Sequence, residues 1–190
     1  MEALFTSTAV VALAEIGDKT QLLAMLLATR FRRPLPIIFG ILVATLANHA
    51  LAALLGAQAA AFLDSPVFRY AVGMSFIAMA AWTLIPDKLD AEEAPRPRFG
   101  AFLTTLVAFF LVEMGDKTQI ATIALGARFH DVVSVTAGTT LGMMIANVPA
   151  IFLGHELLKR IDLAKVRLVA AGLFLIIGLW VLAQTAGWIG

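Results

Sequence analysis

The sequence predicts an all-α polytopic membrane protein with six transmembrane helices, arranged as two inverted three-helix repeats. Three observations support this prediction. Hydrophobic residues make up 61% of the 190 residues and charged residues only 14%, against roughly a quarter in an average soluble domain. Six apolar runs reach about the 20 residues with which a helix crosses a bilayer. One polar seven-residue segment also occurs twice.

The same composition excludes several classes of protein. A soluble domain of this length could not bury so much apolar surface, which excludes a disordered chain, a basic nucleic-acid-binding protein and an ordinary cytosolic enzyme. The absence of cysteine excludes disulfides, thiolate metal sites and a cysteine nucleophile. The net charge of +1 does not point to any class of partner.

Charged residues and prolines separate the six predicted spans. The spans are Ala3–Ala28, Leu35–Phe62, Val67–Ile85, Gly100–Ala127, Val132–Gly154 and Leu168–Trp188. Arg30 to Pro34 end the first span, and Asp64 to Pro66 end the second. The stretch Pro86–Phe99 is polar and rich in proline, as is typical of a linker. The stretch His155–Arg167 alternates basic and apolar residues, which predicts a short amphipathic segment on the membrane surface.

The most informative feature is an internal repeat. The segment Glu15–Gln21 returns as Glu113–Gln119, 98 positions later, and Trp82 returns as Trp180 at the same spacing. The chain therefore divides into a first three-helix repeat (1–85), a linker (86–99) and a second three-helix repeat (100–190), which together form a single membrane domain.

An odd number of spans in each repeat predicts that the second repeat enters the membrane from the opposite side. Arginine and lysine gather in the first, third and fifth loops; these are Arg30, Arg32, Arg33, Lys88, Arg96, Arg98, Lys159, Arg160, Lys165 and Arg167. The other side holds only Arg69 and Arg128. The positive-inside rule then predicts a cytoplasmic linker and two external termini. Inverted repeats with a binding site at the midplane are typical of secondary transporters.

Each copy of the motif places charged residues near the middle of an apolar span. A charge there costs at least ~2.5–3.5 kcal/mol on insertion scales, so it normally faces protein or water and has a function. Carboxylate and amide oxygens are ligands suited to Ca²⁺, Mg²⁺ or Mn²⁺. No resident cofactor is expected, because the metal would be the transported substrate.

We expect one central site built from both repeats. The candidate metal ligands are Glu15, Asp18, Glu113, Asp116, Gln21, Gln119, Asn48 and Asn147. Lys19 and Lys117 are the expected charge partners of the acids, each beside the glutamate four residues earlier on the same helix. Gly17 and Gly115 are the expected points at which each helix opens.

Several neighbouring residues are given structural roles. Interhelical hydrogen bonding is the alternative for Asn48 and Asn147. The hydroxyls of Thr20 and Thr118 are expected to bond to their own helix backbone and not to a metal, unless the helix is broken there. The side chain of His49 is expected to be a structural histidine whose hydrogen bonds are satisfied.

The chemistry of these ligands predicts exchange of a cation for protons. Carboxylates must lose their protons to bind a cation, so metal and proton compete for the same oxygens. The six charged motif residues sum to a charge of −2, which one dication would balance. Two structurally related halves would open this site alternately to each face.

The repeated Glu-x-Gly-Asp-Lys-Thr, at Glu15–Thr20 and Glu113–Thr118, resembles the signature of the Gdt-type cation exchanger family. That family includes bacterial manganese exporters and Golgi calcium/manganese–proton exchangers. The resemblance covers essentially the whole chain and implies export of Mn²⁺ from the cytoplasm in exchange for H⁺, with Ca²⁺ as a second cargo. It also implies a bacterial inner membrane location and carries the family's acidic residues onto Glu15, Asp18, Glu113 and Asp116.

Two other functions stay open at this stage. A six-helix exporter of amino acids would need unpaired positive groups for its carboxylate substrate. An intramembrane enzyme, either an aspartyl protease or a lipid-phosphate phosphatase, would need a carboxylate dyad or a buried arginine. The expected partners are a divalent cation, the proton and membrane lipid, without nucleic acid, and a homodimer stays open.

Overall fold

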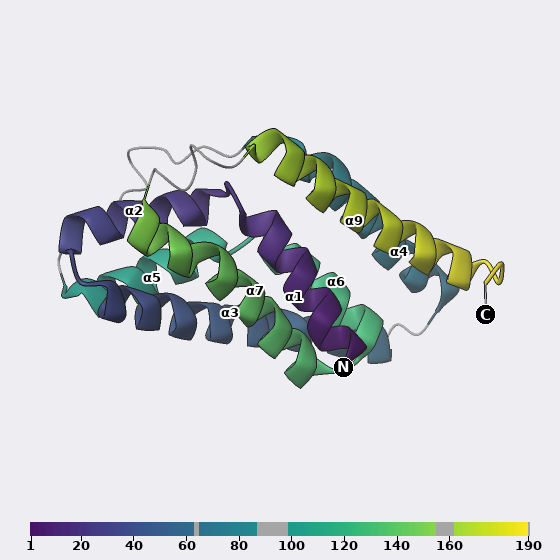
Figure 1. The fold of residues 1–190 in the computed structure, drawn as a ribbon. Helices are drawn as coiled ribbons and strands as arrows, with labels where there is room; N and C mark the ends of the chain where they lie inside the picture. Colours follow the sequence, from purple (N-terminus) through teal and green to yellow (C-terminus); the bar gives the residue numbers. More distant parts are fainter. Residues whose placement is uncertain (63–64, 87–98, 155–161, 190) are drawn as a thin grey trace.

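The computed structural model describes residues 1–62, 65–86, 99–154 and 162–189 (Figure 1). All regular secondary structure in these residues is α-helical. The helices are α1 (Glu2–Glu15), α2 (Lys19–Phe31), α3 (Pro34–Phe62), α4 (Pro66–Thr83), α5 (Ala101–Glu113), α6 (Lys117–Phe129), α7 (Val132–Leu153) and α9 (Leu163–Thr185). The order of long and short helices is the same in both halves of the chain.

Most helix boundaries agree with the expected spans. The second, third and fifth spans correspond to α3, α4 and α7 within two residues at each end. The first and fourth spans are each divided into two short helices. The sixth span begins earlier than expected, because α9 already includes Lys165 and Arg167. These residues therefore lie on a long helix and not on a separate surface segment; the rest of that segment, 155–161, lies outside the described residues.

One close helix contact occurs at equivalent positions of the two halves. The backbone of Gly40 in α3 approaches α5 so closely that a Cβ at this glycine would lie 2.8 Å from Cβ of Thr105. The equivalent Gly138 in α7 meets α1 in the same way, with Cβ of Ser7 at 2.9 Å. Gly138 stands 98 positions after Gly40, and Thr105 stands 98 positions after Ser7. Small residues allow this close approach of two helices, as is usual in membranes.

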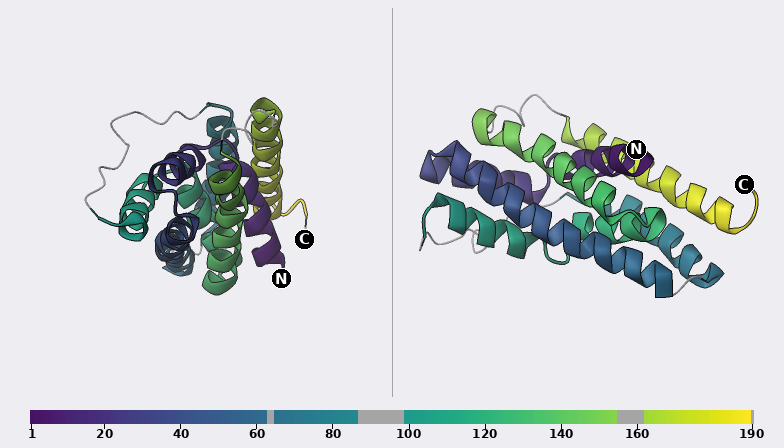
Figure 2. Two further views of the ribbon diagram at one scale, coloured as in Figure 1. Left: turned by 60° about the vertical axis from the view of Figure 1, so that its left-hand side comes forward. Right: turned by 90° about the horizontal axis from the view of Figure 1, so that it is seen from below.

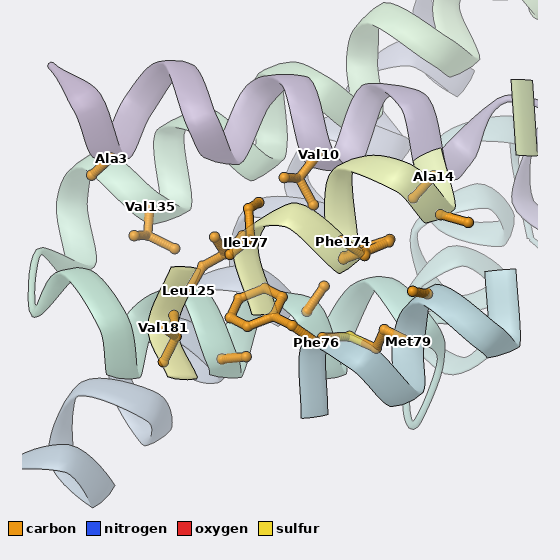
Figure 3. Packing of buried hydrophobic residues seen from close by; sticks show 14 of the residues in the cluster. Ala3, Val10, Ala14, Phe76, Met79, Leu125, Val135, Phe174, Ile177 and Val181 are labelled. Carbon is orange, nitrogen blue, oxygen red and sulfur yellow. The ribbon is translucent and has the colours of Figure 1, made fainter. Parts of the chain in front are cut away.

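The helices α4 and α9 lie side by side along one flank of the molecule (Figures 1 and 2). Their contact centres on Phe76 and Phe174, whose ring centroids are 6.4 Å apart. These two residues also stand 98 positions apart. They belong to a buried apolar cluster that joins this pair of helices to α1 and α6, with Val10 and Leu125 among its members (Figure 3).

The outer surface of the helices is strongly apolar. Three described helices, α3, α7 and α9, are long and apolar enough to cross a membrane. On α9 the exposed side chains include Leu175, Ile176 and Leu179. An apolar surface of this kind is costly in water and is expected in lipid. The apolar composition and the apolar outer surface together indicate that the chain is an integral membrane protein.

Candidate cation-binding site

The two copies of the motif interrupt their helices at the same point. In the first copy α1 ends at Glu15, Gly17 adopts a φ of 83°, and α2 begins at Lys19. In the second copy Gly115 adopts a φ of 79° between α5 and α6. This left-handed backbone is readily adopted only by glycine. Each motif therefore places its glutamate at the end of one short helix and its aspartate at the start of the next.

The glutamines of the motifs hold these turns in shape. The Oε1 atom of Gln21 accepts a hydrogen bond from the backbone N–H of Gly17 at 2.9 Å. The Oε1 atom of Gln119 accepts the same bond from Gly115 at 2.7 Å. The amide oxygens considered as metal ligands are therefore already used by the backbone, which favours a role in shaping the site.

The lysines pair with aspartates of the opposite repeat. Nζ of Lys117 lies 2.7 Å from Oδ1 of Asp18, and Nζ of Lys19 lies 3.1 Å from Oδ1 of Asp116. The expectation that each lysine would lie beside the glutamate of its own helix was wrong. The helix is broken between the two positions, so the spacing of four residues no longer brings them to one face.

Glu15 receives both threonine hydroxyls of the two motifs. Thr20 donates to its Oε2 and Thr118 donates to its Oε1, each at 2.5 Å. Bonding to their own backbone was expected only for an unbroken helix, and the structure shows the exception, because both helices are broken here. Both threonines lie in the first turn after the break. The glycine in each motif was the sequence signal that could have indicated this.

Glu113 is buried at the equivalent position without such donors. Neither of its carboxylate oxygens has a hydrogen bond among the described residues. Oxygens of Glu15, Glu113 and Asp116 all lie within 4.8 Å of one another, and all three residues are buried. Three acidic groups this close repel one another strongly unless protons or a cation separate them. This cluster is the best candidate for holding a metal ion.

His49 lies against the same cluster from α3. Its Nε2 atom is 3.8 Å from Oε2 of Glu113, and the side chain is 0% exposed. Neither ring nitrogen has a hydrogen bond among the described residues. The expectation of a histidine with satisfied hydrogen bonds was therefore wrong. The only sequence signal for this residue was its place directly after Asn48.

The two asparagines border the site with different partners. Asn48 accepts a hydrogen bond from Nε2 of Gln119 at 2.5 Å, which connects α3 to the second motif. Asn147 donates from Nδ2 to the backbone oxygen of Met143 at 3.0 Å, and its own Oδ1 has no hydrogen bond among the described residues. The interhelical hydrogen bonding considered for both residues is found for Asn48, whereas the bond of Asn147 stays within α7. Lining of the site by these residues stays a prediction.

The ion pairs divide the charges of the site unequally. Two lysines balance two aspartates, so the two glutamates carry the excess negative charge. In a medium of low dielectric constant two such charges are costly when unbalanced. The site can therefore accept one divalent cation or an equivalent charge in protons.

The first motif is covered more completely than the second. A Cβ placed on Gly17 would lie 2.8 Å from the side chain of Leu163 in α9, whereas a Cβ on Gly115 would have no atom of the described residues within 4 Å. Met114, next to the second glycine, is 57% exposed. Among the described residues, the turn at Gly17 is thus covered by α9 and the turn at Gly115 is not.

Comparison with known proteins agrees with this arrangement. The sequence profile of the family described as "Divalent cation/proton antiporter GDT1" matches residues 3–91 and, separately, residues 101–188. The two matches correspond to the two halves of the chain. No solved structure matches the chain significantly.

Three relatives illustrate the range of the similarity. A protein of Vibrio cholerae with the name "Putative manganese exporter" is 53% identical over 180 residues, which cover 94% of this chain and 90% of the relative. A GDT1-like protein of Synechocystis is 31% identical over 86% of this chain and 88% of its own length. A GDT1-like protein of Arabidopsis thaliana is 28% identical over 92% of this chain and 68% of its own length.

Proposed function

Because the chain belongs to the GDT1 family of divalent cation/proton antiporters, we propose that it exports Mn²⁺ from the cytoplasm in exchange for protons. As a member of an antiporter family it is a transporter and not an enzyme. The observation that carries the proposal is the buried cluster of Glu15, Glu113 and Asp116, to which both repeats contribute. The name of the Vibrio relative supports manganese as the cargo.

In this proposal the short helices are halves of broken spans. The pairs α1–α2 and α5–α6 each cross the membrane once, and α3, α4, α7 and α9 cross it singly, which makes six spans. The packing contacts repeated 98 positions apart support two repeats of three spans. Since three is odd, the repeats have opposite orientations in the membrane, with external termini and a cytoplasmic linker in the bacterial inner membrane.

The cation binds between the two glutamates, with Asp116 as the third acidic ligand. Asp18 and the two lysines complete the charge balance around it. The glutamines hold the turns, and Asn48 and Asn147 line the edge of the site. Hard oxygen ligands of this kind suit Mn²⁺ and also Ca²⁺, so Ca²⁺ is the second candidate cargo.

Competition for the carboxylates couples the two ions. A carboxylate binds metal only when it is deprotonated, so protons that enter the site displace the cation. Because the two glutamates are buried, they cannot both be charged when the site holds no cation. A site that is full of either metal or protons, and never empty, is the condition for obligatory exchange.

The unequal covering of the two motifs supports access from one side at a time. Leu163 of α9 packs over Gly17, whereas no described residue covers the turn at Gly115. In a transporter with two related halves, exchanging these two arrangements would open the site to the opposite face. The described conformation corresponds to one end of such a cycle.

The rival functions find less support in the site. An exporter of amino acids requires a cationic group that is available to a carboxylate, whereas both motif lysines form ion pairs with aspartates. Membership in an antiporter family also excludes the intramembrane protease and the phosphatase.

Transport by purified protein in lipid vesicles tests the proposal. Vesicles with an acidic interior and a manganese-sensitive dye inside should take up Mn²⁺ while protons leave. Glu15→Gln should abolish both fluxes, whereas Glu2→Gln, at an exposed residue of the N-terminus, should leave them unchanged. Normal exchange by Glu15→Gln would show that the site is elsewhere.

A further inference from the structure

A buried histidine stands beside the carboxylates without a hydrogen-bonding partner. His49 is fully buried in α3, and neither Nδ1 nor Nε2 has a hydrogen bond among the described residues. Buried polar atoms are nearly always paired, because leaving them unpaired costs free energy. An unpaired imidazole therefore indicates a partner that binds during function.

The nearest group to this imidazole is also unpaired. Nε2 of His49 lies 3.8 Å from Oε2 of Glu113, which is too long for a hydrogen bond. Both oxygens of Glu113 are without a hydrogen bond among the described residues. Neighbouring ligands around an octahedral ion with bonds of ~2.1 Å are ~3 Å apart. The two groups are therefore almost at the spacing that a shared cation would impose.

The histidine breaks the symmetry between the repeats. At the spacing of 98 that relates Gly40 to Gly138, His49 of α3 matches Asn147 of α7, so the first repeat has an imidazole where the second has an amide. Only one half can therefore offer a nitrogen ligand to the site. The threonine hydroxyls are also distributed unequally between the repeats. Both donate to Glu15, whereas Glu113 has the imidazole of His49 as its neighbour.

We propose that Nε2 of His49 is a ligand of the transported cation beside Glu113, and that it makes the site selective for Mn²⁺ over Ca²⁺ and Mg²⁺. Ca²⁺ and Mg²⁺ are bound almost entirely by oxygen, whereas imidazole is a good ligand for transition-metal ions. A site with acidic oxygens alone would not distinguish these ions by ligand type. This inference rests on the proposed function and names the residue that sets its selectivity.

Pulsed electron paramagnetic resonance of bound Mn²⁺ tests the ligand directly. The sample is the purified full chain, without an affinity tag, loaded with one equivalent of Mn²⁺. We expect a spin-echo modulation from a directly coordinated ¹⁴N. The variant His49→Val, which removes the nitrogen ligand, should lose this modulation, and His130→Asn, at an exposed position at the end of α6, should keep it.

A second experiment measures selectivity and does not depend on the spectrum. His49→Val should weaken Mn²⁺ binding about tenfold or more, which is the loss typical of disrupted metal sites. Binding of Ca²⁺, measured by calorimetry on the same protein, should change by less than about threefold. An equal loss for both ions would assign His49 a structural role and would overturn the inference.

The inference remains testable if the valine variant fails to fold. The chain has three histidines, so His130→Asn combined with His155→Asn leaves His49 as the only one. Labelling this protein with ¹⁵N-histidine should replace the ¹⁴N modulation by that of ¹⁵N. An unchanged spectrum, or bound Mn²⁺ without any nitrogen modulation, would overturn the role of His49. Failure of the proposed function looks different, because Mn²⁺ would then not bind or would bind equally to Glu15→Gln.

Discussion

Nζ of Lys117 in the second repeat lies 2.7 Å from Oδ1 of Asp18 in the first, with both side chains almost completely buried. The reciprocal pair of Lys19 and Asp116 is longer, at 3.1 Å, and its lysine is 22% exposed. The two halves of the protein are thus joined by two crossed ion pairs of unequal burial. Breaking the more buried pair, Lys117 and Asp18, should therefore cost more free energy than breaking the other pair.

Removal of one partner of the buried pair should destabilise the protein strongly. Lys117→Met leaves the carboxylate of Asp18 buried without its lysine, which typically costs about 3–5 kcal/mol. Thermal unfolding in detergent should show a large decrease in the melting temperature. Lys19→Met should have a smaller effect, because this lysine is 22% exposed and its pair is less completely buried. A double variant, Lys117→Met with Asp18→Asn, should recover part of the loss; purely additive effects would contradict a direct interaction.

The two glycines of the motifs should respond differently to alanine. Both have a positive φ, which costs ~1–2 kcal/mol for a residue with a side chain. Gly17→Ala should cost more than Gly115→Ala, since only the first new methyl group meets the side chain of Leu163. Gly172→Ala is the matched control, because this helical glycine in α9 has open space around it. Equal melting temperatures for the two motif variants would contradict the difference in covering.

The sequence predicted the frame of this site better than its internal contacts. The apolar runs and the repeat spacing indicated α3, α4 and α7 closely, because bilayer thickness and proline positions determine those lengths. The break at Gly17 could be expected from the glycine. The partner of each lysine could not, since it depends on how two separate broken helices cross.

The departures at Thr20 and Thr118 have one physical cause. Both residues were considered on a regular helix, where a hydroxyl can bond to its own backbone. The breaks instead direct both hydroxyls at Glu15. No local sequence pattern shows that both threonine hydroxyls bind Glu15 and that neither binds Glu113. That feature appears only when the halves are packed together. His49 does lie on a regular helix, α3, and its error is different, because its ring has no hydrogen bond among the described residues.

Loss of a threonine hydroxyl should weaken transport without unfolding the protein. Thr118→Val keeps the shape of the side chain but removes the hydrogen bond to Oε1 of Glu15, and a bond to a charged group contributes about 1.5–3 kcal/mol. Initial rates of Mn²⁺ uptake should fall about tenfold or more, and Thr118→Ser should restore them. Thr29→Val is the control, because the hydroxyl of Thr29 bonds to the backbone of its own helix. Equal activity of the valine and serine variants would show that the hydroxyl has no role.

Exchange should be electroneutral, with two protons for each Mn²⁺. The excess charge of the site resides on two glutamates, so two protons replace one dication without a change of net charge. A potassium gradient with valinomycin should therefore leave the rate of Mn²⁺ uptake unchanged, while a pH gradient should alter it. A rate that depends on the imposed membrane potential would show that a different number of protons moves.

The most direct measurement of the account is the position of the metal itself. Diffraction from crystals of the manganese-loaded protein, recorded at the manganese absorption edge, gives an anomalous peak at each bound ion. We predict one strong peak at ~2–2.3 Å from carboxylate oxygens of both Glu15 and Glu113, with Asp116 as a further ligand. A peak bound by one repeat alone, or a strong peak elsewhere with none between these glutamates, would contradict a shared cation site.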